Sequence, residues 1–486
     1  MLKKNLFYSS ILSVTQFIFP LITFPYSSRI LGPGGIGSVN FIDSITAYFV
    51  LFAALGIPTY GIRETAKRKN NKEELNKFVS ELMLIHITSV AVFSLFYLAT
   101  GLIVPTLRAH LDLIFVGIGL LWVNVITVEW FFQGIEMFQY TSLRSLVSRT
   151  LSVVFLYVFL KKGSPSIVYY LIGASGPTLN GLINIINFRK HAKINFSALS
   201  IKETFKKHFK PLVTILGSSL AISVYALMDS IILGFIKGDV EVGLYSTALR
   251  IVRIPFAVIG AISAVMIPQV SQAYHARDTN TVSSLIHKSF SFISVIGIPI
   301  AVGMFLEADF LINFFAGKTF ADAISVLQLL SPVIILVGFT NIFALQILNP
   351  IGQERLLFKA VFIGMIFSII SNLCLIPLLS YKGAGVTFLL TEGLVPLLSY
   401  FFARRFVEIT LDTKIFLQCL FGSALFFPIA LAIRSLKLEM SVTELLIIAS
   451  CTIFYCIYVW FFVKNTYITN IKQLVLNKLP FKVARA

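Results

Sequence analysis

Residues 80–104 read SELMLIHITSVAVFSLFYLATGLIV and carry one acidic and no basic side chain. A helix of about 20 mostly apolar residues is long enough to cross a lipid bilayer. The strands of an outer-membrane barrel would instead alternate apolar and polar residues over about ten positions, and this stretch has no such alternation. Residues 80–104 therefore predict a membrane-spanning α-helix.

The rest of the chain repeats this composition. Of its 486 residues, 57% are hydrophobic and 13% are charged, and the mean hydropathy is +0.87. Soluble proteins carry about a quarter charged residues, so a water-soluble core is not expected. We predict an all-α polytopic membrane protein with about 14 transmembrane helices, the first of them retained rather than cleaved as a signal peptide. The predicted spans are 6–28, 38–60, 80–104, 112–133, 143–160, 166–188, 210–235, 243–266, 286–306, 323–348, 357–379, 384–403, 414–434 and 442–463.

The basic residues orient these helices. With the N-terminus placed in the cytoplasm, 29 Lys and Arg side chains fall on the cytoplasmic side and nine on the external side, while Arg250 and Arg253 lie inside a helix. An excess of basic residues marks the cytoplasmic side of a membrane protein. We therefore expect both termini in the cytoplasm, and the net charge of +18 requires no nucleic-acid partner. Residues 196–207 are amphipathic and are expected on the inner membrane surface.

Short motifs recur in the two halves of the chain. Ile-Leu-Gly at 30–32 is echoed at 232–234, Ile-Gly at 36–37 is echoed by Val-Gly at 242–243, and Ile-Pro at 57–58 is echoed at 267–268. Helices 1–6 and 7–12 therefore resemble two copies of one unit, and both copies begin on the cytoplasmic side. Parallel copies of this kind place a substrate path between two lobes. The predicted division is an N-lobe over 1–195, a C-lobe over 196–409, and helices 13 and 14 with a cytoplasmic tail over 410–486.

Several segments resemble a known family. Residues 129–136 read EWFFQGIE and are followed by Arg144. This pattern resembles the E/D-W-x-x-Q-G-x-E…R segment of the polysaccharide transporters, which are O-antigen and capsule repeat-unit flippases (Wzx-like) of the MOP superfamily. Residues 229–234 (DSIILG) and 242–246 (VGLYS) resemble the start of that family's second lobe. Residues 28–32 (SRILG) are similar to the end of the first helix in the related lipid II flippases.

The resemblance implies a V-shaped pair of six-helix lobes around a central cavity, in the inner membrane of a bacterium. The implied substrate is an oligosaccharide linked to undecaprenyl pyrophosphate, which passes from the cytoplasmic to the external leaflet for O-antigen or capsule synthesis. Alternating access coupled to H⁺ or Na⁺ is expected. Besides this lipid-linked oligosaccharide and the membrane lipids, other polysaccharide-assembly proteins are candidate partners.

Cationic side chains in the apolar segments are candidate ligands for the pyrophosphate, because a planar guanidinium binds phosphate oxygens in a bidentate way. Arg250 and Arg253 are three residues apart in a predicted helix and so share one face. An ion pair with Asp229 is the structural alternative for them. The other candidates lie at helix ends, where snorkelling or positive-inside topology explains them equally well. The five candidates are Arg29, Arg144, Arg149, Arg250 and Arg253.

Embedded carboxylates are candidates for ion coupling. A charge at the bilayer centre costs roughly 2.5–3.5 kcal/mol on insertion scales, so such residues persist where they face a cavity or a partner. They would bind a proton or Na⁺, or equally neutralise the arginines. The four candidates are Asp43, Glu129, Asp229 and Glu392. Five embedded amides could bind sugar hydroxyls, although hydrogen bonds between helices are the expected role for each. They are Asn124, Asn180, Asn184, Asn341 and Gln346.

Two other functions remain open. A multidrug exporter of the same superfamily is the first alternative, although its cavity would need acids and aromatic residues more than arginines. A membrane polysaccharide polymerase or ligase is the second, although no long external loop and no catalytic motif is present. We therefore expect a transporter rather than an enzyme, with no cofactor and no metal site.

Overall fold

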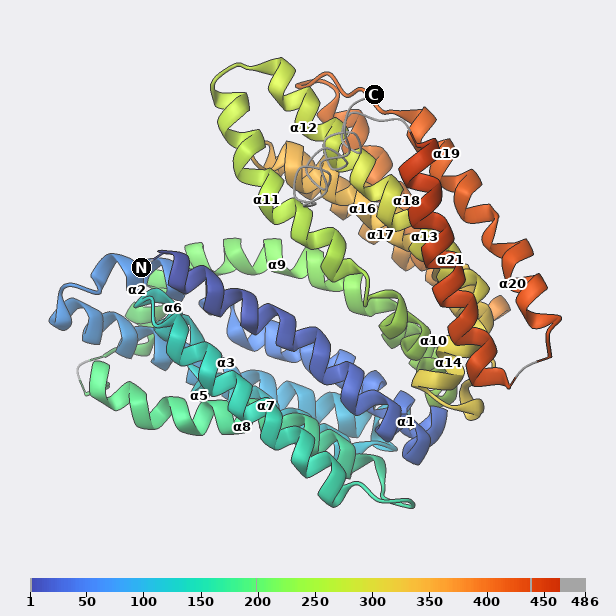
Figure 1. The fold of residues 1–486 in the computed structure, drawn as a ribbon. Coiled ribbons are helices and arrows are strands. Elements are labelled where there is room, and N and C mark those ends of the chain that lie inside the picture. Colours follow the sequence, from blue (N-terminus) through green and yellow to red (C-terminus); the bar gives the residue numbers. More distant parts are fainter. Residues whose placement is uncertain (1, 198, 438, 464–486) are drawn as a thin grey trace. The chain divides into compact units, whose positions relative to one another are not determined.

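The structure is a computed structural model that describes residues 2–197, 199–437 and 439–463, and for 2–18, 218–226, 440 and 441 it describes the backbone alone. The predicted tail over 464–486 lies outside the described residues. All regular structure in the described part is helical (Figure 1). The helices are α1 Leu2–Ala54, α2 Ile57–Arg68, α3 Lys72–Ile103, α4 Pro105–Arg108, α5 Leu111–Thr127, α6 Glu129–Gly134, α7 Phe138–Phe159, α8 Ser166–His191, α9 Ile201–Lys237, α10 Asp239–Val252, α11 Phe256–His275, α12 Thr279–Phe292, η1 Ile293–Gly297, α13 Ile298–Leu306, α14 Ala308–Phe315, η2 Lys318–Phe320, α15 Ala323–Leu330, α16 Val333–Thr340, η3 Asn341–Leu348, α17 Glu354–Leu379, α18 Tyr381–Ala403, α19 Thr413–Ala424, α20 Phe426–Arg434 and α21 Met440–Phe462.

The polytopic all-α fold is confirmed. Eleven helical segments in the described part of the chain are long and apolar enough to cross a membrane. The first of them, Phe19–Arg68, contains the second predicted span and the end of the first, residues 19–28, so these eleven correspond to twelve of the fourteen. The remaining two predicted spans, 166–188 and 210–235, fall within the long helices α8 and α9.

The first two predicted spans are joined without a loop. Helix α1 runs from Leu2 to Ala54 and departs from helical geometry at Gly32, where φ is 65° and ψ is −176°. A positive φ of this size is accessible to glycine at little cost. Pro33 follows at once, and proline fits the first turn of a helix because it has no backbone N–H to bond there. The expected loop over 29–37 is therefore a kink at one residue.

The chain packs into two compact units. The first contains 1–246, 314–320 and 372–384. Within it, α1 packs against α3, α5, α7 and α9, and α5 packs against α8 (Figure 1). Its largest fully buried side chains include Phe24, Phe41, Tyr97, Phe131 and Phe132.

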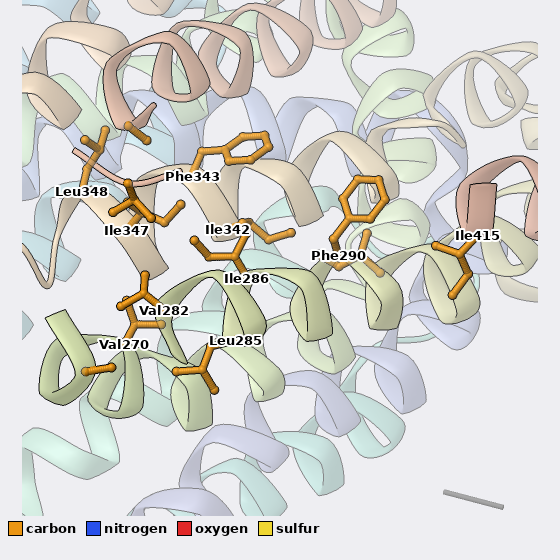
Figure 2. Close-up of a cluster of buried hydrophobic side chains, with 14 of the residues drawn as sticks. Val270, Val282, Leu285, Ile286, Phe290, Ile342, Phe343, Ile347, Leu348 and Ile415 are labelled. Carbon is orange, nitrogen blue, oxygen red and sulfur yellow. The ribbon is translucent and has the colours of Figure 1, made fainter. Parts of the chain in front are cut away.

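The second unit contains 247–313, 321–371 and 385–486. Its main core cluster joins α11, α12 and η3, and includes Val270, Val282, Leu285, Ile286 and Ile347 (Figure 2). Two stretches of this unit, η1 and η3, are π-helical. The division into 1–195, 196–409 and 410–486 stays a prediction.

One local expectation was wrong. The helix predicted over 243–266 is interrupted by a turn at Arg253, Ile254 and Pro255, because Pro255 cannot donate a backbone hydrogen bond and caps α11 instead. Arg253 therefore lies in the turn between α10 and α11 rather than inside one helix with Arg250. In the amphipathic segment 196–207, residues 201–207 form the first turns of the long helix α9, and its place on the inner membrane surface stays a prediction.

Candidate functional site

Arg144 lies at the centre of a buried polar cluster in the first unit. Its side chain is on α7 and is 4% exposed. One guanidinium nitrogen donates to Glu129 Oε1 at 3.1 Å, and the other donates to Asn184 Oδ1. The Tyr140 ring lies 5.7 Å from the guanidinium carbon, and the Tyr140 hydroxyl donates to Asn184 Oδ1 at 3.0 Å. Among the predicted site residues, the structure thus brings Glu129 and Arg144 together.

The backbone next to Glu129 explains its position. Val128, between α5 and α6, has φ 38° and ψ 34°, a left-handed conformation that is uncommon for a β-branched residue. This break ends α5 at Thr127 and starts α6 at Glu129. Asn184 Nδ2 donates to the Thr127 carbonyl, which α5 leaves available at its end. The strained turn therefore holds Glu129 beside Arg144.

The Arg144 cluster continues as a row of polar contacts between α7 and α8. The Ser148 hydroxyl donates to Asn180 Oδ1 at 2.8 Å, and the Ser152 and Ser175 hydroxyls lie 2.9 Å apart. Arg144, Ser148 and Ser152 follow one another at intervals of four residues on α7, so they share one helix face. The interhelical role predicted for Asn180 and Asn184 is confirmed.

Asp43 is exposed on α1 and accepts a hydrogen bond from the Tyr170 hydroxyl at 3.2 Å. The Tyr170 oxygen lies 3.1 Å from Thr46 Oγ1, which in turn lies 2.8 Å from the Tyr97 oxygen. Tyr170, Thr46 and Tyr97 are all buried. A chain of hydroxyls therefore leads from the Asp43 carboxylate into the core of the first unit.

Asp229 is a buried carboxylate on α9 with two neutral donors. The Tyr245 hydroxyl donates to its Oδ2 at 2.8 Å, and Asn372 Nδ2 donates to its Oδ1 at 2.5 Å. Hydrogen bonds to the ionised form of a carboxylate stabilise that form. Asp43 and Asp229 thus each accept a bond from a tyrosine, but from different tyrosines.

Arg29 is exposed near the end of the first part of α1. Its guanidinium donates to the Pro25 carbonyl at 2.6 Å and to the Phe314 carbonyl at 2.7 Å. Ser28, its neighbour, donates to the Phe315 carbonyl at 3.2 Å. Arg29 therefore ties α1 to the end of α14, within the first unit.

The remaining candidates occupy different elements. Arg149 is half-buried on α7, one turn beyond Arg144. Arg250 is half-buried on α10, Arg253 is exposed in the turn after it, and Glu392 is buried on α18. Their roles stay predictions.

Sequence reasoning missed a buried cluster around Glu81 on α3. His208 Nε2 lies 3.0 Å from Glu81 Oε2, and Lys207 Nζ lies 2.6 Å from the same oxygen. The Tyr60 oxygen lies 2.9 Å from His208 Nδ1, so the cluster joins α2, α3 and α9. Glu81 falls inside the predicted span 80–104. An acidic residue inside a predicted span is the same signal that identified the four candidate acids.

A second missed cluster lies in the second unit. Arg434 contacts Glu307 Oε1 at 3.3 Å and Glu444 Oε2 at 3.2 Å, and both carboxylates are at least nine-tenths buried. Glu444 lies in the predicted span 442–463 and carried the same signal as Glu81. No group of His, Cys, Asp and Glu suited to a metal ion is present among the residues that the structure describes.

Family models match most of the chain. One described as "Polysaccharide biosynthesis protein" matches residues 2–274, more than half of the sequence, and one described as MatE matches residues 215–374. The chain belongs to the polysaccharide biosynthesis protein family. This match confirms the resemblance to the polysaccharide transporters of the MOP superfamily.

Named relatives of this family member cover most of its length. A protein of Escherichia coli (strain K12) named "Putative O-antigen transporter" is 25% identical over 407 residues, which are 83% of this chain and 97% of the relative. A protein of the same name from Shigella dysenteriae is 22% identical over 82% of this chain and 98% of its own. Both names describe transport and neither describes an enzyme, in agreement with the prediction.

Among solved structures, the family member is similar to one described as the lipid II flippase MurJ in an inward-closed conformation. The TM-score is 0.72 and the identity is 16%, over 96% of this chain and 99% of that one. At this identity the likeness shows the fold. It agrees with the predicted polytopic helical architecture.

Proposed function

We propose that this protein is a flippase that moves oligosaccharide repeat units linked to undecaprenyl pyrophosphate from the cytoplasmic to the external leaflet. The observation that carries the proposal is the family match over residues 2–274, together with a transporter relative whose length is covered to 97%. The polymer served would be an O-antigen or a capsule. The membrane would be the bacterial inner membrane, with both termini in the cytoplasm.

In this proposal, four of the five candidate arginines meet the anionic head group as it crosses, and Arg144 supports them. Arg29, Arg250 and Arg253 are exposed or half-buried, so their side chains are not enclosed in the protein core. Arg144 is buried and bonded to Glu129, so it would act by holding α7 and α8 and thereby presenting Arg149.

Ion coupling is the second part of the proposal. A carboxylate that gains and loses a proton or Na⁺ needs access and an alternative hydrogen-bond partner. Asp43 has both, since it is exposed and is bonded to the hydroxyl chain of Tyr170, Thr46 and Tyr97. Asp229, Glu129 and Glu392 are the other proposed coupling acids.

A cellular experiment tests the flippase proposal. The gene would be deleted in its host in a background without a second flippase, and lipid-linked repeat units would be measured together with surface polymer. We expect repeat units to accumulate on the cytoplasmic leaflet and the polymer to be lost. Unchanged external repeat units and unchanged polymer would exclude the proposal.

A multidrug exporter is the second candidate function, and the MatE match over residues 215–374 favours it. The two functions make opposite demands, since a cationic drug needs acids where a pyrophosphate needs arginines. Overexpression in a drug-sensitive strain separates them. We expect no change in drug susceptibility, and a broad rise in resistance to cationic drugs would support the exporter instead.

A further inference from the structure

A pocket lies in the first unit where the start of α3 meets the ends of α5 and α8. Both α3 and α8 pack against α5 (Figure 1). The pocket has a volume of about 490 Å³. Met83 lines it from α3, Ile126 lines it from α5, and Ile185 and Phe188 line it from α8. Its inner walls are therefore apolar.

The backbone around the pocket is held in place by local structure. Val128, whose left-handed conformation ends α5, is one of the lining residues. After α8, the backbone N–H of Lys193 donates to Asn76 Oδ1 at 2.8 Å, and the backbone N–H of Asn195 donates to Ser80 Oγ at 2.9 Å. These two bonds tie the segment after α8 to α3, so that the segment forms a fixed rim of the pocket.

The rim carries two cations that no other side chain neutralises. Arg189, in the last turn of α8, and Lys193 both line the pocket, and both residues are exposed. Neither side chain forms a hydrogen bond or an ion pair with another residue that the structure describes, and no described lining residue is acidic. By contrast, Arg68, Lys69 and Lys207 each contact a glutamate. The mouth of the pocket is therefore positively charged.

The surface beside the pocket is apolar. Leu182 and Ile186 on α8 are 52% and 68% exposed, and Ile194 and Phe196 after the helix are exposed as well. In a membrane protein, exposed apolar surface of this kind contacts lipid. In the predicted orientation α8 ends on the cytoplasmic side, so the pocket opens toward lipids of the inner leaflet.

The lining residues select the chemistry of the ligand. Two cations above apolar walls match an amphiphile with a phosphate and hydrocarbon chains, since basic pockets at the cytoplasmic ends of transmembrane helices bind anionic lipid head groups. A zwitterionic head group would bring its own cation against Arg189 and Lys193, which opposes binding. Apart from these two cations, every described lining side chain is apolar, so the sugars of a lipid-linked oligosaccharide would find no hydrogen-bonding side chains.

We propose that this pocket binds phosphatidylglycerol, as a site for membrane lipid rather than for the transported substrate. The phosphate accepts hydrogen bonds from Arg189 and Lys193, and the upper part of the acyl chains lies against Met83, Ile126 and Ile185. The bound lipid fastens the start of α3 to the ends of α5 and α8. The predicted orientation decides only which leaflet supplies the lipid, and the site does not depend on what the protein transports.

Native mass spectrometry of the purified full-length protein tests the proposal. The protein would be titrated separately with dioleoyl phosphatidylglycerol, phosphatidylethanolamine and phosphatidylcholine. We expect one phosphatidylglycerol to be retained about tenfold better than either zwitterionic lipid, because each cation near an anionic head group strengthens binding by a factor of about five. Equal retention of the three lipids, a preference for a zwitterionic lipid, or displacement of phosphatidylglycerol by an equal concentration of undecaprenyl phosphate would overturn the proposal.

Charge-removing variants separate this site from the general positive charge of the cytoplasmic surface. Arg189→Gln and Lys193→Gln should each lower phosphatidylglycerol retention about fivefold. Lys190→Gln is the matched control, since it removes an exposed cation next to Arg189 that does not line the pocket, and it should change retention little. Wild-type retention in Arg189→Gln, or an equal loss in Lys190→Gln, would show that the pocket does not bind this lipid.

A second pair of variants adds charge instead of removing it. Ile194 lines the pocket and Phe196 does not, and their side chains are 39% and 42% exposed, so a glutamate fits at either position without entering the core. Ile194→Glu should abolish the preference for phosphatidylglycerol, because it places an anion beside Arg189 and Lys193. Phe196→Glu adds the same charge outside the pocket and should keep the preference. If the two variants behave alike, the lipid binds elsewhere.

Discussion

At the residue scale, the nine candidates differ in what surrounds them. Arg144 combines an ion pair, an amide bond and a ring contact in the core of the first unit, whereas Arg253 is exposed in a turn. Removing Arg144 leaves the buried Asn184 oxygen without a donor, whereas removing an exposed side chain such as Arg253 takes away few contacts. Replacing Arg144 should therefore mainly lower stability, whereas replacing Arg253 should mainly lower transport.

Arg144→Ala should destabilise the protein by about 1–3 kcal/mol, because the buried Asn184 oxygen loses a donor and Glu129 loses its ion-pair partner. Arg253→Ala should change stability by no more than about 0.5 kcal/mol and still lower transport, if it contacts substrate. Unfolding of purified protein and accumulation of lipid-linked repeat units in cells measure the two effects. An Arg144→Ala protein that unfolds like the wild type would contradict the structural role.

His110 gives a pH-dependent prediction. Its Nε2 lies 3.3 Å from Asp239 Oδ2, and this hydrogen bond raises the pKa of His110, with a further contribution from Asp112. The pair therefore contributes stability that is complete below the unfolded pKa of about 6.5 and is lost as the pH rises through the higher folded value. Relative to His110→Asn, the wild type should gain thermal stability as the pH falls from 8 to 6. Parallel curves for the two proteins would show that the contact contributes nothing.

At the element scale, two glycines of the repeated motifs lie at one crossing of α1 and α10. A Cβ on Gly37 would lie 1.7 Å from the Asp239 carbonyl oxygen, and one on Gly243 would lie 2.0 Å from that of Pro33. Nearby, Asn40 donates to the Ser246 hydroxyl at 3.1 Å. Glycine is therefore required at both repeated positions, because the backbones of α1 and α10 approach too closely there for any side chain.

Gly243→Ala should disturb this crossing, because the clash is with backbone that cannot rotate away. We expect lower thermal stability and reduced transport. Gly260→Ala is the matched control, since it adds the same methyl group to a helix where no atom lies within 4 Å. Equal behaviour of the two variants would mean that α1 and α10 separate without cost.

The existence of the helices could be predicted from apolar length, but their breaks could not. The kink at Gly32 occupies one residue where a loop was expected, and η1 and η3 are π-helical within stretches for which apolar length predicts only a continuous helix. Packing selects such geometry, and composition does not record it. Likewise, the motif pointed to Glu129 and Arg144 as separate candidates, while their pairing depends on the left-handed Val128. The Glu307 cluster was missed because its members are far apart in sequence.

At the scale of the whole molecule, orientation rests on the distribution of basic residues. Twenty-nine Lys and Arg side chains against nine predict a cytoplasmic N-terminus. In a variant without the four native cysteines, Lys162→Cys should react with an impermeant maleimide in intact cells. Lys193→Cys should react only after the cells are permeabilised. The reverse pattern would invert the topology and with it the direction of transport.

The flippase activity itself is tested most directly with purified protein in liposomes that contain an undecaprenyl-pyrophosphate oligosaccharide. Access of an external glycosidase to the oligosaccharide would be followed over time. We predict that sugar protected in the inner leaflet becomes accessible, with the lipid-linked substrate chemically unchanged, and that Arg250→Ala and Arg253→Ala slow this exposure. A protected fraction that stays as large as in protein-free liposomes, under every imposed H⁺ or Na⁺ gradient, would contradict the proposed function.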